Sequence, residues 1–329
     1  MSEKPSSVIV VGSYVQDHVW LTDSFPKPGE TRRALGFSTG PGGKGFNQAI
    51  ACVRQAGDVL FMGAVGSDAL GHGAREYASR EGLACKWLVI DEVPTATAGI
   101  VVNAEGANQI MVNLAANEKL TIDFLQSNAS QFADARVLLV QLENNLDAVR
   151  GALELGGRHG LLRMLNPAPM HAGVDASLLA ECDVITPNET EFAQLLQHIA
   201  GKPLPPAEVA AKADRELNEC CRRLGVATCL ITLGASGCFV SHAPDNLRGD
   251  SEPFYRLPAE VVHAVDTTGA GDAFNGALAA ALGRATKGSF REAVVEANRV
   301  AALSTEKPGA AQAIPFRAEV IERFGGTTG

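Results

Sequence analysis

The feature that most constrains the fold of this chain is a regular alternation of short apolar runs and longer helical stretches. Val8–Val11 is an unbroken β-branched run that stops at Gly12, as a strand buried on both faces would. Further strands, each with a helical stretch after it, are predicted at 59–63, 137–141, 161–165, 184–186 and 228–232. Because strand–helix–strand units place their strands parallel, we expect an α/β fold, a mostly parallel central sheet between two helical layers.

Two stretches break this alternation. Short strands are predicted at 18–21, 31–38, 87–89, 99–103 and 109–112, with a hairpin turn at 104–106. We interpret these strands as a small β-sheet lid built from insertions at about 13–40 and 86–115. Because no linker rich in Pro, Ser or Gly divides the chain, we predict a single domain over residues 1–329.

Charge and cysteine content exclude several classes of protein. The chain has 28 Lys and Arg against 37 Asp and Glu, a net charge of −9 without basic clusters, so we expect no nucleic-acid or anionic membrane partner. The seven cysteines include no C-x-x-C pair, and several lie in apolar runs, which is typical of reduced thiols in a cytoplasmic protein. No apolar run approaches 18 residues, and the residues before Val8 do not resemble a signal peptide. We therefore expect a cytoplasmic protein.

The strongest local motif is Asp266-Thr-Thr-Gly-Ala-Gly-Asp272, which follows a predicted strand at 261–265 and opens a helix. Its small residues allow backbone N–H groups to converge where the helix begins, and the helix dipole also favours an anion there. Asp272 would then lie beside a transferring phosphoryl group. The residues are equally consistent with a structural role, in which the glycines form a tight turn and Asp272 caps the helix.

A second motif is Gly40-Pro-Gly-Gly-Lys44-Gly-Phe-Asn47. Its glycines allow a ligand to approach the backbone, and Lys44 and Asn47 offer hydrogen-bond donors to hydroxyl groups. The segment contains the G-x-G-x-x-G pattern of dinucleotide-binding folds, but that pattern directly follows the first strand, which here ends at Gly12. It is not a Walker A loop either, because a glycine follows Lys44.

The two motifs resemble the paired signatures of the ribokinase family, also called the phosphofructokinase-B family of carbohydrate kinases. Four segments between them resemble family segments in the same order and spacing: 141–143, 166–169, 186–191 and 232–237. The resemblance runs from about Val8 to Pro315. It implies a ribokinase-like three-layer α/β/α sandwich with a lid, and ATP-dependent phosphorylation of the primary hydroxyl of a sugar. The first substrate expected is D-ribose, giving ribose 5-phosphate.

The resemblance also implies roles for individual residues. Asp272 matches the catalytic base, and the anion hole for the γ-phosphate matches Gly269, Ala270 and Gly271. The sugar-binding positions match Asp17, Gly43, Lys44, Asn47, Glu143 and Asp272. The ATP-binding positions match Asn188, Thr232, Gly234, Gly237, Gly271 and Asn298. Glu191 matches a residue that holds Mg²⁺ through water, and a monovalent-cation site for K⁺ matches Asp266, Thr268, Ser304, Lys307 and Gly309.

Three positions depart from the family pattern and leave alternatives open. Val15 replaces a typical Asn and Phe46 replaces a small residue, which would alter one wall of the sugar pocket unless both side chains serve packing. If they form a stacking surface, a nucleoside becomes an alternative substrate, beside another pentose or a hexose. Ala313 replaces a serine ligand of the cation, so the requirement for K⁺ is open.

Two further hypotheses concern assembly and activity. The predicted lid strands carry apolar residues such as Trp20, Ile100 and Val102, so we expect a homodimer formed through the lid. The alternative to an enzyme is a non-catalytic sensor of sugar or nucleotide, although a sensor would not need Asp272.

Overall fold

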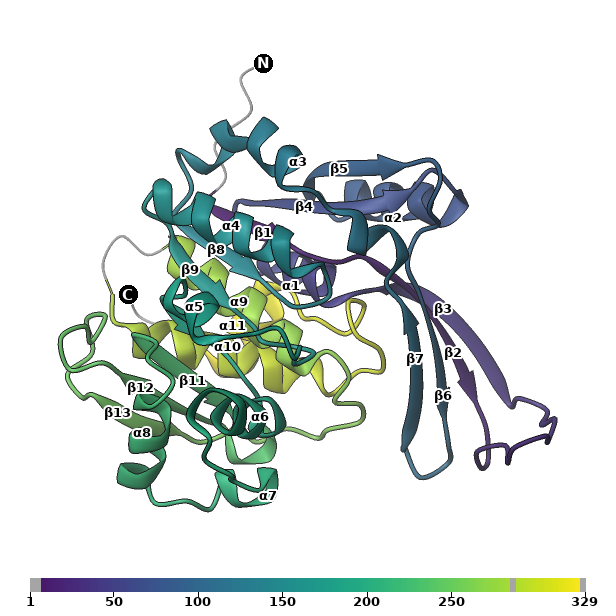
Figure 1. Cartoon of the computed structure of the whole chain (residues 1–329). Helices are drawn as coiled ribbons and strands as arrows, with labels where there is room; N and C mark the ends of the chain where they lie inside the picture. The colour runs from purple at the N-terminus through teal and green to yellow at the C-terminus, as the bar shows by residue number, and fades with distance from the viewer. Residues whose placement is uncertain (1–6, 285–287, 326–329) are drawn as a thin grey trace.

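The computed structural model describes residues 7–284 and 288–325, in which helices pack on a large sheet and a small sheet extends from it (Figure 1). The predicted absence of a signal peptide concerns the segment before Val8, of which residues 1–6 lie outside the described part. Among the described residues, no helix is long and apolar enough to cross a membrane.

The large sheet has nine strands within the described residues, in the order β13-β12-β11-β10-β9-β8-β1-β4-β5. The strands from β5 to β11 in this order are parallel, and β12 and β13 are antiparallel at one edge. Their bounds are β1 (Val8–Val11), β4 (Val59–Gly66), β5 (Ala84–Ile90), β8 (Val137–Val140), β9 (Leu162–Leu165), β10 (Val184–Ile185), β11 (Thr228–Thr232), β12 (Cys238–His242) and β13 (Phe254–Leu257). The prediction of a mostly parallel sheet is confirmed.

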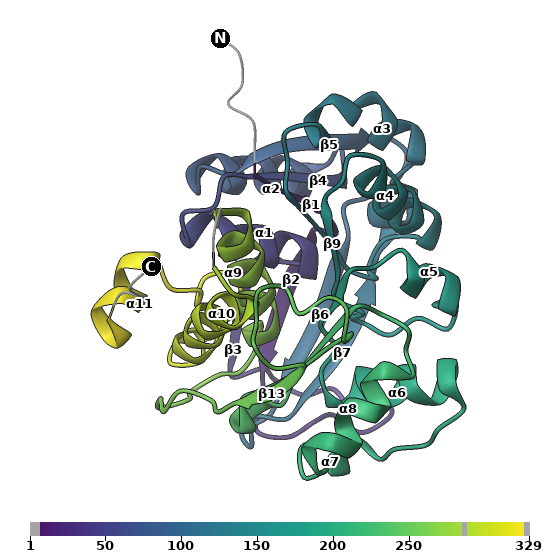
Figure 2. The same cartoon turned by 90° about the vertical axis from the view of Figure 1, so that its left-hand side faces the viewer.

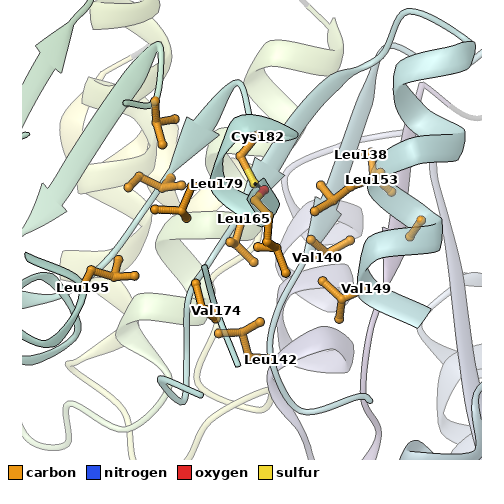
Figure 3. Packing of buried hydrophobic residues seen from close by; sticks show 14 of the residues in the cluster. Leu138, Val140, Leu142, Val149, Leu153, Leu165, Val174, Leu179, Cys182 and Leu195 are labelled. Atoms are coloured by element: carbon orange, nitrogen blue, oxygen red, sulfur yellow. Dashed lines mark hydrogen bonds between the residues drawn. The ribbon is translucent and has the colours of Figure 1, made fainter. Parts of the chain in front are cut away.

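The central strands are buried on both faces, because successive side chains enter two different cores. Val8 and Val10 pack in one apolar cluster, whereas Ile9 and Val11 pack in the other. Leu138 and Val140 share the second cluster with the helical residues Val149 and Leu153, as Figure 3 shows.

One helical layer contains α3 (Ile122–Ser127), α4 (Leu146–Arg158), α5 (Ala176–Ala180), α6 (Glu189–Ala200), α7 (Pro206–Val209) and α8 (Asp214–Arg222). The other layer contains α1 (Lys44–Arg54), α2 (Ala69–Arg80), α9 (Ala270–Arg284), α10 (Phe290–Ser304) and α11 (Arg317–Phe324). Short 3₁₀ helices are η1 (Ala115–Lys119), η2 (Ala129–Phe132) and η3 (Gly234–Ser236). The two layers enclose the sheet (Figure 2), which confirms the predicted sandwich.

The small sheet has the order β3-β2-β6-β7, with β2 (Val15–Leu21) parallel to β6 (Thr97–Val102). The outer strands β3 (Gly36–Gly42) and β7 (Asn108–Asn113) are antiparallel to their neighbours. The prediction that 87–89 belongs to the lid is wrong. This segment lies in β5, which pairs along β4, and Trp87 packs against Phe61 with 5.1 Å between ring centroids.

Three other predictions need correction. The segment 261–265 is not a strand, because its backbone N–H groups bond to residues 305 and 306 and not to a neighbouring strand. Val261 in this segment is 92% exposed. β3 begins at Gly36 rather than at 31. A single 3₁₀ turn and the antiparallel strand β12 follow β11, where we predicted a helix.

The close packing of α1 against α9 brings the two sequence motifs together. A Cβ on Gly276 of α9 would lie 2.1 Å from the carbonyl oxygen of Gln48 in α1, so only glycine allows this approach. α1 begins at Lys44 within the first motif, and α9 begins at Ala270 within the second. The ends that carry the motifs are therefore neighbours.

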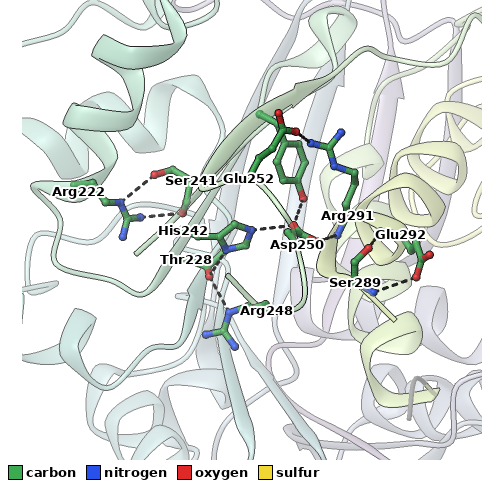
Figure 4. Close-up of polar contacts among 11 residues, drawn as sticks. Arg222, Thr228, Ser241, His242, Arg248, Asp250, Glu252, Ser289, Arg291 and Glu292 are labelled. Carbon is green, nitrogen blue, oxygen red and sulfur yellow. Dashed lines mark hydrogen bonds and ion pairs between the residues drawn. The ribbon is translucent and has the colours of Figure 1, made fainter. Parts of the chain in front are cut away.

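A buried polar network lies where α10 begins (Figure 4). His242 contacts Thr228 through Nδ1 at 3.0 Å and Asp250 through Nε2 at 3.0 Å, and the backbone N–H of Arg291 donates to Asp250 at 2.8 Å. Burial lowers the pKa of His242, although Asp250 opposes the effect, so the neutral ring donates from Nε2. The network attaches the start of α10 to the antiparallel edge of the sheet.

The seven cysteines are free thiols, and six of them are buried. Cys85 in β5 is partly exposed.

Candidate active site

The candidate residues gather at the carboxyl edge of the parallel strands. Ser13 follows β1, Glu143 follows β8 and Asn188 follows β10. Because these strands are parallel, their carboxyl ends meet at one edge, where open α/β sheets bind ligands.

Asp272 lies in the first turn of α9 and faces α1. Its Oδ2 accepts a hydrogen bond from Asn47 Nδ2 at 3.0 Å, and its Oδ1 accepts one from Gln48 Nε2 at 2.9 Å. Asp272 is the third residue of the helix rather than the residue before it, so the helix-cap alternative is wrong.

Gln48 is a site residue that the sequence analysis missed. Its side chain is fully buried, and Nε2 also donates to Asn166 Oδ1 at 3.0 Å. Because a carboxylate only accepts, the amide group of Gln48 must face Asp272, and its Oε1 must accept from Gln141 Nε2, at 2.6 Å. The resulting chain of amides fixes Oδ1 of Asp272. The available signal was its position directly after Asn47, at the end of the second motif.

A second carboxylate, Glu143, organises the start of α1. Its Oε2 accepts from Ser13 Oγ at 2.5 Å and from the backbone N–H of Lys44 at 2.8 Å. The pKa of Lys44 is raised: burial opposes the charged form, but the negative charges of Asp272, Glu143 and Glu191 outweigh it. The Lys44 ammonium therefore stays charged among these carboxylates.

Asp17 reaches the same region from β2 of the small sheet. It lies against Gly42, where an added Cβ would be 2.1 Å from Asp17 Oδ2. Burial raises the pKa of Asp17 to about 7, and the charges of Glu143 and Asp272 add to the effect. Gly43, with φ +88°, forms the turn into α1.

The glycine turn before α9 is held from two sides. Gly269 has φ +74°, which favours glycine, and an added Cβ would lie 3.0 Å from Ala310. Asn275 Nδ2 donates to the carbonyl oxygen of Gly271 at 2.8 Å, and Thr186 Oγ1 donates to Asn275 Oδ1 at 2.5 Å. The turn leads directly into the amino end of α9, a site that favours anions.

The residues predicted to bind ATP fall into two neighbouring groups. Asn188 pairs with Thr232 through an isolated β-bridge. Asn298 Nδ2 donates to the carbonyl oxygen of Pro258 at 2.7 Å, and an added Cβ on Gly237 would also contact Pro258. Gly234 opens the 3₁₀ turn between Thr232 and Gly237. These contacts bring the start of α6, the turn around η3 and α10 to one region.

The residues predicted to bind cations present oxygen atoms, which suit Mg²⁺ and K⁺. Glu191 Oε2 accepts a hydrogen bond from the backbone N–H of Asn188 at 2.9 Å. Burial raises the pKa of Glu191, although this hydrogen bond and the charge of Lys44 lower it. Asp266 accepts from the backbone N–H groups of Thr268, at 2.9 Å, and Gly309, at 2.8 Å.

The segment 304–309 lies beside Asp266, whose N–H donates to the carbonyl oxygen of Thr305 at 3.0 Å. This segment contains Ser304, Lys307 and Gly309, so the predicted K⁺ residues are neighbours. The hydroxyl of Ser304 donates to the carbonyl oxygen of Ala301 at 2.7 Å, and its oxygen lone pairs stay available to a cation.

Two of the three departures from the family pattern, Phe46 and Val15, are buried in apolar clusters. Phe46 is fully buried and packs edge to face against Tyr14, with 5.0 Å between ring centroids. Val15 is 2% exposed and packs against Ala96 and Ala98. Neither side chain offers a surface on which a base could stack.

The structure thus places a buried carboxylate, Asp272, beside a glycine turn at the edge of an α/β sheet where ligands bind. The sequence pattern of the pfkB family carbohydrate kinases matches residues 5–317, and this chain belongs to that family. The predictions of the family and of an ATP-dependent carbohydrate kinase are therefore confirmed.

Individual relatives cover nearly the whole chain. The ribokinase of Haemophilus influenzae is 35% identical over 317 residues, which cover 96% of this chain and 97% of the relative. The deoxyribokinase of Salmonella typhimurium is 32% identical over 320 residues, which cover 96% of this chain and 97% of that relative. The structure of Arabidopsis thaliana ribokinase complexed with ribose and ATP superposes with a TM-score of 0.82 at 25% identity, covering 97% of this chain and 98% of that one.

Proposed function

We propose that this protein transfers the γ-phosphoryl group of ATP to the primary hydroxyl of D-ribose, giving ribose 5-phosphate. The observation that carries the proposal is the Asp272 carboxylate, held by Asn47 and Gln48 beside the glycine turn. The relatives named ribokinase, one of them solved with ribose and ATP, support both substrates.

In this proposal the sugar lies among Asp17, Gly43, Lys44, Asn47 and Glu143. On binding, Asn47 turns its amide from Asp272 Oδ2 to a sugar hydroxyl, which frees Oδ2 to accept the proton of the attacking hydroxyl. Gln48 keeps its hydrogen bond to Oδ1 throughout, so the carboxylate does not rotate away. The sugar oxygen then attacks the γ-phosphorus, and ADP leaves.

The phosphate side uses backbone N–H groups and cations in place of a basic surface. In this proposal the N–H groups at Gly269 and Gly271 stabilise the charge on the transferring group, and the N–H of Ala270, which donates to the carbonyl oxygen of Thr267 at 3.2 Å, turns to join them. ATP lies along Asn188, the 232–237 turn and Asn298. Glu191 is suited to hold Mg²⁺ through water, and the oxygens around Asp266 are suited to K⁺; both cations would offset phosphate charge. The backbone of Ala313 remains available where a serine side chain is missing.

A substrate series tests the proposal. We expect ADP release with D-ribose, lower or comparable release with deoxyribose, and none above background with adenosine, inosine or cytidine, because Val15 and Phe46 are buried. A coupled assay of ADP release measures this. Turnover of a nucleoside without turnover of ribose would replace ribose by the nucleoside alternative, and binding without any turnover would support the sensor.

We also propose that the chain is one catalytic domain with the small sheet as its lid, and that the lid forms a homodimer. Trp20 is 39% exposed, and it is joined on the small sheet by the more exposed Phe37, Ile110 and Met111. Ile100, in contrast, is partly buried and packs against the small sheet's own apolar cluster. Sedimentation of the purified protein should give twice the chain mass, and Phe37→Glu should give the monomer; a monomeric wild type would contradict the proposal.

A cytoplasmic location is supported by the free cysteines, and cell fractionation would test it.

A further inference from the structure

Arg54, at the last turn of α1, is the most densely bonded arginine near the candidate site. Its side chain is 7% exposed, and it forms two hydrogen bonds with Glu81, the residue that follows α2, Nε to Oε2 at 2.9 Å and Nη2 to Oε1 at 2.7 Å. The ring of Phe316 stacks on the guanidinium, 4.8 Å from Cζ to the ring centroid.

The remaining nitrogen of Arg54 holds a loop that is remote in sequence. Nη1 donates to the carbonyl oxygens of Ala311 at 3.0 Å and Ile314 at 2.7 Å, with a longer contact to that of Gln312 at 3.4 Å. A guanidinium is planar, always charged and rich in donors, so it can fix several carbonyl groups and a carboxylate at once. Without it, Glu81 and these buried carbonyl groups would lose their partner, which is costly.

The loop 309–314 contacts the phosphate side of the site and also the small sheet. Gly309 donates to Asp266, at the start of the glycine motif, and Ala310 lies against Gly269, in its turn. On the other side, an added Cβ on Gly40 of β3 would lie 2.9 Å from Gln312 Nε2. The loop 309–314 therefore packs directly against the 266–271 turn.

We propose that Arg54 is a positioning residue for phosphoryl transfer: it fixes the loop 309–314, and through this loop the 266–271 turn, relative to α1. The same helix carries Asn47, so α1 aligns the sugar side and the phosphate side of the reaction. The proposal rests on the proposed function for its chemistry, but the positioning of the loop is measurable without substrate. Catalysis by positioned groups is sensitive to displacements of about 1 Å.

The test compares Arg54→Met with a matched control, Arg163→Met. Arg163 is likewise a partly buried, ion-paired arginine, bonded to Asp183 at 3.0 Å and Glu181 at 2.9 Å, but it lies in β9 and contacts none of the loop residues named above. Hydrogen exchange by mass spectrometry, without substrate, reports on the loop, and steady-state kinetics with D-ribose report on the reaction.

We expect Arg54→Met to increase exchange at least tenfold in peptides covering 309–314 and 266–271, and to lower kcat at least tenfold while the KM for ribose changes less than threefold. Arg163→Met should leave exchange in these peptides and kcat near wild type, even if its melting temperature falls. Should Arg54→Met fail to fold, Arg54→Lys, which keeps the charge but not the fork of donors, is expected to show a smaller change of the same kind.

Unchanged exchange in the loop of a folded Arg54 variant would overturn the positioning. An equal loss of kcat in the control would overturn its link to catalysis. A wild type that phosphorylates no sugar would overturn the proposed function, whereas the exchange result would still decide the positioning of the loop.

Discussion

Replacing Asp272 by Asn should lower kcat by about a thousandfold, because a general base contributes roughly 10²–10⁴ to the rate. The KM for ribose should change only a few fold, since the amide keeps the shape of the carboxylate. The new amide would present a donor where Asn47 Nδ2 now donates, but Asn47 Oδ1 is buried without a hydrogen-bond partner within the described residues and can turn to accept. The pocket should therefore stay intact while the base is lost.

Steady-state kinetics and calorimetric titration with ribose measure the two effects separately. Asp175→Asn is the matched control, because Asp175 caps α5 through Leu178 and asparagine caps helices equally well. Unchanged kcat in Asp272→Asn would remove Asp272 from the mechanism. Loss of ribose binding together with kcat would show a structural role instead.

Replacing Asp17 by Ala should raise the KM for ribose by about a hundredfold. A carboxylate that accepts two hydroxyl hydrogen bonds contributes about 1.5–3 kcal/mol per bond to binding, and a site built for hydroxyls loses much of its affinity when one partner is missing. The effect on kcat should be smaller, because Asp17 does not contact the phosphate side. A KM within threefold of wild type would exclude Asp17 from the sugar site.

The raised pKa of Asp17 also predicts a pH dependence for ribose binding. Burial and the charges of Glu143 and Asp272 disfavour the ionised form, so its pKa lies at about 7. Sugar hydroxyls donate to the ionised form, so ribose binding should release a proton and the affinity should rise as pH increases from 6 to 8. Calorimetry without nucleotide measures this, and Asp17→Asn, which cannot titrate, should lose the dependence; its persistence would contradict the assignment.

The parallel sheet could be predicted because its strands are buried on both faces and therefore appear as continuous apolar runs, as in Val8–Val11. The lid boundary could not, because a short apolar run such as 87–89 does not reveal which sheet it joins. Trp87 belongs to the main sheet through its pairing with Gly63 and its packing on Phe61. The segment 261–265 has strand-like residues but no strand beside it.

Candidate site residues could be named from the sequence where they lie in contiguous motifs, and were missed where their role depends on distant partners. Asn47 and Asp272 were identified from two separate motifs, and the packing of α1 on α9 brings them within a hydrogen bond. Gln48 and Arg54 have ordinary neighbours in sequence, but their partners are 224 and 257 residues away. Their contacts depend on the folded arrangement of helices, which local patterns do not contain.

The central claim, that Asp272 drives phosphorylation of the primary hydroxyl of ribose, is tested most directly by identifying the product. D-ribose, ATP, Mg²⁺ and K⁺ are incubated with the wild type or with Asp272→Asn, and the products are examined by phosphorus and carbon NMR. We predict ribose 5-phosphate, with phosphorus coupled to the C5 carbon, at a rate about a thousandfold higher in the wild type. A phosphate on C1, no phosphosugar from the wild type, or equal rates for the two proteins would contradict the claim.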